Sequence, residues 1–179
     1  MSADTSYDAR TGAVVGHLEV STPHEVTETV HRAAAAAAAV AAATPGERAG
    51  WLNALADALV EEGTAGELVA TADRETALGE TRLSGELART AQQLRFYADV
   101  AAEGSWLAAT IDHARDAAPD LRRLRVPLGP VAVLGASNFP FAFGTLGHDT
   151  ASALAAGCPV VASRNAWISV PVCSPVSSQ

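Results

Sequence analysis

A short loop in the C-terminal half of the chain carries the residues best suited to chemistry. It reads Gly135-Ala136-Ser137-Asn138-Phe139-Pro140 and follows Val131–Leu134, an apolar run typical of a strand buried on both faces of a parallel sheet. Ligands of open α/β sheets bind beyond the carboxyl ends of the strands, which is where this loop lies. Pro140 restricts the backbone of Phe139, so we expect a tightly fixed loop geometry.

Asn138 has two interpretations, because an asparagine at this point can serve a ligand or the backbone. Its side-chain amide, fixed at a strand end, can donate hydrogen bonds to an oxyanion that develops on a carbonyl. It can equally cap the helix that we expect to begin near Pro140 and to cover residues 142–156. The loop lacks the G-x-G-x-x-G pattern, so the usual pyrophosphate argument does not apply.

Composition excludes several classes of function. The chain has 179 residues, a formal net charge of −8 at pH 7, and twelve basic residues that are all arginine. Without lysine it cannot be a Schiff-base enzyme, a pyridoxal enzyme or a P-loop protein. Its acidic balance argues against nucleic acid as a partner. The N-terminus does not resemble a signal peptide, and the alanine run 33–43 is too short to span a bilayer, so we expect a soluble, cytoplasmic protein without a membrane partner.

The two cysteines are poor candidates for a nucleophile or a metal ligand. Cys158 begins the second apolar run of the C-terminal half and is interpreted as a small core residue. Cys173 lies in a serine- and proline-rich stretch, without a neighbouring base or cation that would favour its thiolate. Two cysteines cannot build a disulfide scaffold, and the histidines show no metal-binding spacing, so we expect no metal.

The periodicity of apolar residues predicts an α/β fold with a helical N-terminal layer. Residues 1–20 lack a sustained pattern and are expected to form a ragged or extended arm. Helices are predicted over about 21–43, 44–60, 65–78 and 84–103. The stretch 121–126 alternates apolar and basic residues, as a half-exposed strand does. Strand 131–134, a helix and a strand at 160–161 then make one βαβ unit with parallel strands.

Several segments together resemble one enzyme family. They are Gly129-Pro130-Val131-Ala132-Val133, Ala136-Ser137-Asn138-Phe139-Pro140 and residues 149–161, with Glu75-Thr76, Gly85-Glu86, Arg89-Thr90 and Gln93-Leu94-Arg95 upstream. This pattern resembles the N-terminal part of the aldehyde dehydrogenase superfamily, and is most similar to its 2,5-dioxovalerate (α-ketoglutarate semialdehyde) dehydrogenases. The resemblance implies a Rossmann-like cofactor domain and the oxidation of an aldehyde to a carboxylic acid with NADP or NAD. In that family a cysteine thiolate attacks the aldehyde, and a glutamate activates water.

The resemblance also implies roles for individual residues. Asn138 matches the asparagine that stabilises the oxyanion, and it closes a stretch that lines the cofactor: Gly135, Ala136, Ser137 and Asn138. Phe139 and Phe143 match the wall of the substrate tunnel, although an ordinary core role stays open for both. The strand at 121–126 resembles part of an oligomerisation arm, which implies a homo-oligomer.

The family resemblance divides the chain into five parts. They are an arm at 1–20, a helical segment of the cofactor domain at 21–112, a loop with an oligomerisation-type strand at 113–127, the first βαβ unit at 128–161, and a non-family tail at 162–179. After Val161 the family continues into a lysine that holds the cofactor ribose or its phosphate. Here the chain reads Ala162-Ser163-Arg164-Asn165, and Arg164 is a candidate replacement.

Three interpretations of the whole chain follow. The first is a truncated aldehyde dehydrogenase, inactive alone because it lacks the family's nucleophile and general base. The second is a non-enzymatic interaction module that joins intact subunits through 121–126, or a degraded product of a frameshifted gene. The third is a free-standing binding domain. Because one incomplete βαβ unit leaves both sheet edges uncovered, we expect marginal stability and a tendency to aggregate.

Overall fold

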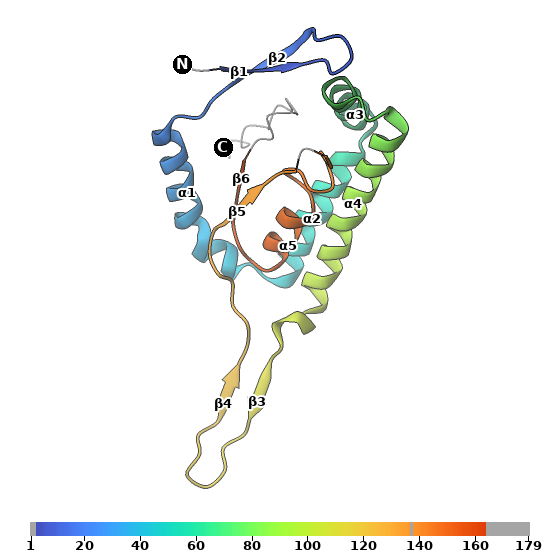
Figure 1. Ribbon diagram of the computed structural model, residues 1–179. Coiled ribbons are helices and arrows are strands. Elements are labelled where there is room, and N and C mark those ends of the chain that lie inside the picture. Colours follow the sequence, from blue (N-terminus) through green and yellow to red (C-terminus); the bar gives the residue numbers. More distant parts are fainter. Residues whose placement is uncertain (1–2, 137, 164–179) are drawn as a thin grey trace, which may run out of the picture.

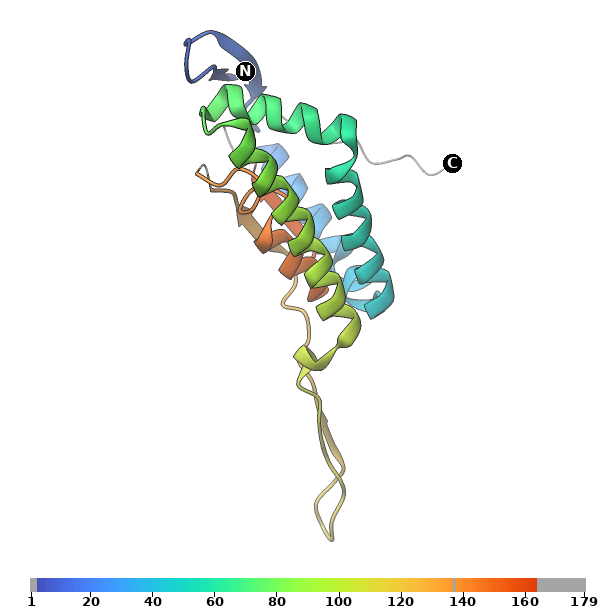
Figure 2. The same cartoon turned by 90° about the vertical axis from the view of Figure 1, so that its right-hand side faces the viewer.

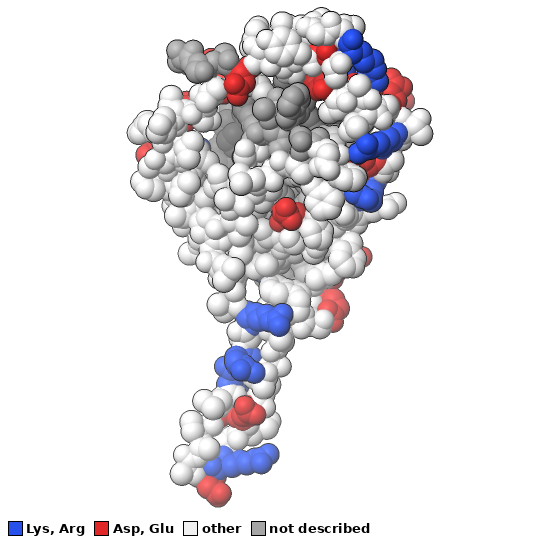
Figure 3. All heavy atoms as spheres, viewed as in Figure 1, with Lys and Arg blue, Asp and Glu red and all other residues white. Residues whose placement is uncertain are grey.

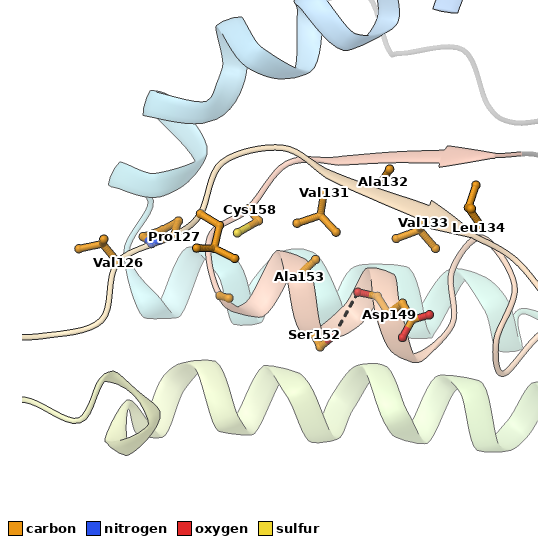
Figure 4. Close-up of a pocket in the computed structure, with 12 residues that line it drawn as sticks. Val126, Pro127, Val131, Ala132, Val133, Leu134, Asp149, Ser152, Ala153 and Cys158 are labelled. Atoms are coloured by element: carbon orange, nitrogen blue, oxygen red, sulfur yellow. Dashed lines mark hydrogen bonds between the residues drawn. The ribbon is translucent and has the colours of Figure 1, made fainter.

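The computed structural model describes residues 3–136 and 138–163. Its elements in chain order are β1 (Ala3–Tyr7), β2 (Val14–Glu19), α1 (Pro23–Ala42), α2 (Pro45–Val60), α3 (Glu62–Thr76), α4 (Glu80–Glu103), the 3-10 turn η1 (Ser105–Leu107), β3 (Thr110–Asp112), β4 (Leu121–Arg123), β5 (Val131–Leu134), α5 (His148–Ala155) and β6 (Val160–Ser163). Helix α1 lies on one side of the β5–β6 pair, and α5 and α2 lie on the other, with α4 beyond them (Figures 1 and 4).

The first two helices begin where the sequence predicts, because each carries a complete capping box. The Thr22 hydroxyl accepts from the Glu25 backbone N–H at 3.2 Å, and Thr44 and Glu47 repeat the arrangement. In return each glutamate accepts from the threonine N–H, which lowers the pKa of both carboxyls below the usual 4.5. Their contribution to stability is therefore complete above that value, and it is lost as the pH falls through the lowered one.

The core forms where α4 packs against α2, α3 and α5. Its fully buried apolar side chains are leucines and alanines, large and small residues that together fill the space between the helices. They include Leu52, Ala56, Ala72, Leu83, Ala91, Leu94, Ala101 and Ala151. Each fully buried leucine contributes about 1.5–3 kcal/mol relative to an exposed one. The helical layer is thus stabilised largely by the face of α4 that the apolar period predicts.

Residues 3–19 form a hairpin, where the sequence indicates only an extended arm. Strands β1 and β2 pair antiparallel, and the Asp8 side chain shapes the turn by accepting from the backbone N–H groups of Arg10 and Thr11 at 2.9 and 2.8 Å. Gly12 completes the turn in the left-handed region, with φ of 71°. The turn is made by residues that are neighbours in the sequence. The strands are not predicted because the apolar alternation typical of a strand is weak here.

Several contacts dock this hairpin on α3, among them the Ala9 N–H, which donates to the Arg74 carbonyl oxygen at 2.8 Å. The Ser6 hydroxyl donates to the buried Glu75 carboxylate at 2.6 Å. Arg10 makes a two-pronged ion pair with Asp73, with both N–O distances at 2.9 Å. The partners in these last two contacts lie 69 and 63 residues apart in the sequence, so no local pattern reveals them.

Strands β3 and β4 form a second hairpin that projects away from the helical layer (Figures 1 and 2). They pair antiparallel over three residues each, and β4 ends at Arg123 instead of reaching Val126. The Arg125 N–H donates to the Leu107 carbonyl oxygen at 2.9 Å, which joins the base of the hairpin to η1. Every residue of β4 is exposed.

The βαβ unit has the predicted order and direction. Strands β5 and β6 pair parallel, with Val131 opposite Val160 and Leu134 opposite Ser163. The helix between them is shorter than predicted: α5 begins at His148, after the N-cap residue Gly147, so a helix beginning near Pro140 is wrong.

Residues 135–147 form the β5–α5 connection, a series of tight turns in the part that the structure describes. The Phe143 N–H donates to Phe139 and the His148 N–H to Ala142, but no continuous helical ladder forms. A Cβ at Gly144 would lie 1.9 Å from the Pro140 carbonyl oxygen, so this coil requires glycine there. Glycine is also a poor helix former, which explains why the helix begins late.

The side chain of Glu86 holds this connection against α4. Its Oε1 accepts from the backbone N–H groups of Phe141 and Ala142 at 2.9 and 3.0 Å, and the residue is only 6% exposed. A carboxylate is a stronger acceptor than a neutral oxygen, so these two charge-assisted hydrogen bonds are stronger than those between backbone groups of the connection. A helix residue thereby satisfies two turn N–H groups that no carbonyl reaches.

We predict that Gly144→Ala lowers the free energy of unfolding by about 1–3 kcal/mol, because the backbone must shift to admit the methyl group. Gly50→Ala on α2, where nothing lies within 4 Å of the added Cβ, is the matched control. It should stabilise the protein by about 0.5–1 kcal/mol through helix propensity. Urea unfolding measures both, and equal effects of the two variants would contradict the packing argument.

We predict that Glu86→Ala releases the connection, since it leaves two buried N–H groups without an acceptor at about 1–3 kcal/mol each. In Glu86→Ala, the amide hydrogens of Phe141 and Ala142 should exchange with solvent much faster than in the unaltered chain. Glu86→Gln keeps an acceptor oxygen, so its exchange should stay near that of the unaltered chain. Slow exchange in both variants would show that another group holds these amides.

Candidate functional site

Asn138 lies beyond the carboxyl end of β5, at the edge where β6 also ends. It is exposed, and its backbone carbonyl oxygen accepts from Arg82 Nη2 on α4 at 2.8 Å. Its side-chain amide makes no hydrogen bond with the described residues. The capping interpretation is wrong, because the N-cap of α5 is Gly147. The backbone of Asn138 is thus held while its amide stays available.

The residues before Asn138 present little bulk at the same strand end. Gly135 and Ala136 are half-buried, and the Ala136 N–H donates to the Phe143 carbonyl oxygen at 2.8 Å. Ser137 lies outside the described residues. The carboxyl ends of parallel strands are where α/β folds bind cofactors, and at most one methyl group stands in the way at these two described positions. Small side chains at these positions are compatible with a ligand close to the backbone.

Phe139 and Phe143 contact one another, with ring centroids 5.7 Å apart at an interplanar angle of 76°. Neither belongs to the buried core, to which this segment contributes Phe141 instead. Phe143 is 38% exposed, and Phe139 is half-buried. The pair forms an apolar wall beside Asn138 that solvent can reach.

The aromatic wall continues onto α5 and α4 through His148. The His148 ring lies 6.2 Å from Phe143 and 5.2 Å from Tyr97, measured between centroids. The Tyr97 hydroxyl lies 3.1 Å from Nε2 and 3.2 Å from Nδ1 of His148. Burial, and to a smaller extent the charge of Asp149, raises the pKa of Tyr97, so its hydroxyl stays protonated at neutral pH. This row of rings joins the site to the helical layer.

Arg82 and Arg89 complete the surroundings of Asn138. Their guanidinium carbons lie 5.3 and 5.7 Å from the centroid of Phe139. Sequence reasoning missed both residues and the role of Glu86. The available signal was the spacing of charged residues along one helix, since residues four and seven positions apart share a face.

Cys158 does not take part in this site. It is 3% exposed, and its backbone N–H donates to the Ala153 carbonyl oxygen at 2.9 Å. It lies at the side of an apolar hollow of about 410 Å³ between β5 and α5, lined by Val131, Val133 and Ala153 among others (Figure 4). Cys173 and Arg164 lie outside the described residues.

The described residues contain no group of three or more His, Cys, Asp or Glu side chains that could hold a metal ion. Within the same part of the chain, each helix is too short or too polar to cross a membrane.

Comparison of sequences finds curated relatives of the chain. It is 53% identical over 119 residues to α-ketoglutaric semialdehyde dehydrogenase 2 of Azospirillum brasilense, which covers 64% of this chain and 22% of that protein. It is 41% identical over 146 residues to α-ketoglutaric semialdehyde dehydrogenase of Acinetobacter baylyi, covering 79% of this chain and 27% of the relative. The chain thus spans about a quarter of the length of these curated relatives.

Comparison of structures agrees. The chain superposes on an aldehyde dehydrogenase of Brucella melitensis biovar abortus 2308 with a TM-score of 0.83 and 23% identity, covering 93% of this chain and 33% of that one. For the succinate-semialdehyde dehydrogenase of Burkholderia pseudomallei the TM-score is 0.79 at 25% identity, with 90% and 32% covered. The sequence model of the Aldehyde dehydrogenase family matches residues 2–170, and so extends past Val161. With its sequence and fold both matched over most of its length, the chain belongs to the aldehyde dehydrogenase family.

Proposed function

We propose that this chain forms the N-terminal part of a cytoplasmic, NADP- or NAD-dependent aldehyde dehydrogenase that oxidises an aldehyde to a carboxylic acid. The single observation that carries the proposal is Asn138, whose backbone is held by Arg82 while its amide is free and exposed. The names of the curated relatives support 2,5-dioxovalerate, the α-ketoglutarate semialdehyde, as the substrate.

In this proposal Asn138 stabilises the charge that develops on the aldehyde oxygen when a nucleophile attacks. A donor that is already in place need not reorganise during the reaction, and this is what lowers the barrier. The placement comes from α4: Arg82 holds the Asn138 carbonyl oxygen, and Glu86 holds the amides of Phe141 and Ala142. Phe139 and Phe143 form the wall along which the aldehyde approaches.

The backbone of Gly135 and Ala136 would hold the cofactor, together with Ser137 and Asn138, which the family resemblance adds. When bound there, NADP or NAD would supply the hydride acceptor for the oxidation. The residues of this chain keep the strand end clear of bulk and orient the aldehyde oxygen. The buried Cys158 is not the attacking thiol in this proposal, because it precedes β6 and so lies at the opposite end of the parallel strand pair from Asn138.

The β3–β4 hairpin supports association between copies of the chain. Each of its two strands has one edge that no described strand covers. Ile111, Leu121 and Leu124 are 54–57% exposed along it, and Val126 is 70% exposed. Free strand edges with apolar side chains are templates for pairing. A homo-oligomer would use this hairpin, and so would the alternative function of an interaction module.

We predict aldehyde-dependent formation of reduced cofactor when residues 1–163 are fused to the part of the Azospirillum brasilense relative that follows its matching segment. Asn138→Ala in this fusion should lower kcat by about 10²–10³-fold. Asn53→Ala, an exposed asparagine on α2, is the matched control and should have no effect. The 179-residue chain alone should show no turnover. An Asn138→Ala fusion with full activity would overturn the proposed role.

We predict that the double substitution Ile111→Asp and Leu124→Asp reduces self-association in sedimentation experiments, because it places charge on the hairpin edge. Val26→Asp on α1 alters a side chain of similar exposure, 50%, and should leave association unchanged. Equal association of all three proteins would exclude the hairpin as the interface.

A further inference from the structure

Two arginines on α4 flank the site and share one face of the helix. Arg82 and Arg89 are seven residues apart, about two helical turns, and both are exposed. The guanidinium groups meet the ring of Phe139 at 5.3 and 5.7 Å. Basic side chains are seen along the edge of the molecule over α3 and α4 (Figure 3). Two positive charges thus stand beside Asn138.

Neither arginine has a carboxylate partner among the described residues, although other arginines of this region do. Arg95, further along α4, pairs with Asp57 at 2.7 Å, and Arg10 pairs with Asp73. Glu86 lies between Arg82 and Arg89 in the sequence, but it is buried, and its Oε1 is engaged by the amides of the connection. Glu86 therefore forms no ion pair with either arginine among the described residues.

The chemistry of this pair suits a carboxylate. Guanidinium groups are planar donors that bind carboxylate oxygens with two parallel hydrogen bonds, and an aromatic face beneath them fixes their plane. Arg82 uses one nitrogen on the Asn138 carbonyl oxygen, which leaves its other N–H groups for a ligand. The contact also fixes where the charge lies relative to the amide that would hold an aldehyde oxygen.

We infer that Arg82 and Arg89 bind the carboxylate at the far end of the substrate, so that the enzyme selects aldehydes that carry a second, anionic group. This inference rests on the proposed function, since Asn138 must hold the aldehyde end. The apolar wall of Phe139 and Phe143 lies between the two ends and contacts the carbon chain. A neutral aldehyde of equal length has no anionic group for the two arginines to bind, and it should therefore bind more weakly.

The full 179-residue chain can test the carboxylate site without turnover. Glutarate is the probe, glutaramide is its neutral counterpart, and NMR follows the Nε–H signals of Arg82 and Arg89 and the amide of Phe139. Glutarate should shift these signals and glutaramide should not. Arg82→Gln and Arg89→Gln should each weaken glutarate binding about tenfold or more. Arg95→Gln, on the same helix but paired with Asp57, is the control and should bind normally.

Lysine variants separate recognition from folding. Arg82→Lys and Arg89→Lys keep the positive charge but lose the planar guanidinium group. Their affinity for glutarate should therefore be lower than that of the unaltered chain and higher than that of the glutamine variants. Circular dichroism checks that each variant is folded. The inference is overturned if glutarate does not bind the unaltered chain, if glutaramide binds equally well, or if all arginine variants bind glutarate equally.

The fusion enzyme separates this inference from the proposed function. Arg89→Gln should lower kcat/KM about tenfold or more for 2,5-dioxovalerate and leave that for pentanal unchanged, because Arg82, and not Arg89, holds the Asn138 backbone. An equal loss for both aldehydes would overturn the specificity role while the dehydrogenase function stands. A fusion inactive on every aldehyde, with arginine-dependent glutarate binding in the chain, would overturn the function and leave the anion site.

Discussion

The position of the site depends on one carboxylate on a helix that accepts two backbone hydrogen bonds from a coil. Glu86 belongs to the longest helix, whose apolar face forms the core, and its charge reaches the amides of the β5–α5 connection. Burying a carboxylate is costly unless hydrogen bonds compensate. The two hydrogen bonds to Glu86 form only when the connection places both amides against Oε1, so they favour that one backbone conformation. The geometry of Asn138 therefore follows from the rigidity of the helical layer, and the loop alone would not define it.

The same helix links the scaffold to the chemistry through side chains that flank its packed face. Leu83, Leu87 and Leu94 point into the core, while Arg82 and Arg89 border the site. A helix whose packed face is fixed is a precise platform for the side chains that flank it. The hollow between β5 and α5, by contrast, is an apolar surface that the described residues leave open, as a two-stranded sheet must.

Much of this arrangement could be predicted from the sequence wherever the signal is local. A threonine followed by a proline and an acid predicts the starts of α1 and α2, and the apolar run before Gly135 predicts β5 and the loop beyond it. The predicted start of α5 is wrong for two reasons. The backbone packs tightly at Gly144, and Glu86 on α4 holds the Phe141 and Ala142 amides in a non-helical arrangement. The N-terminal hairpin was missed because its docking partners lie on α3. The sequence does not predict the role of Arg82 and Arg89, because arginines at this spacing also occur on ordinary solvent-exposed helix faces.

The docking of the β1–β2 hairpin on α3 has a consequence for the order of folding. Its turn uses only neighbouring residues, so the strands can pair as soon as they are synthesised. Ser6 and Arg10, however, find Glu75 and Asp73 only after about sixty further residues have been added. Contacts of such long separation form late because closing the loop costs entropy. During synthesis this hairpin is thus complete well before the helix that anchors it, and the outer edges of its two strands stay uncovered for that interval.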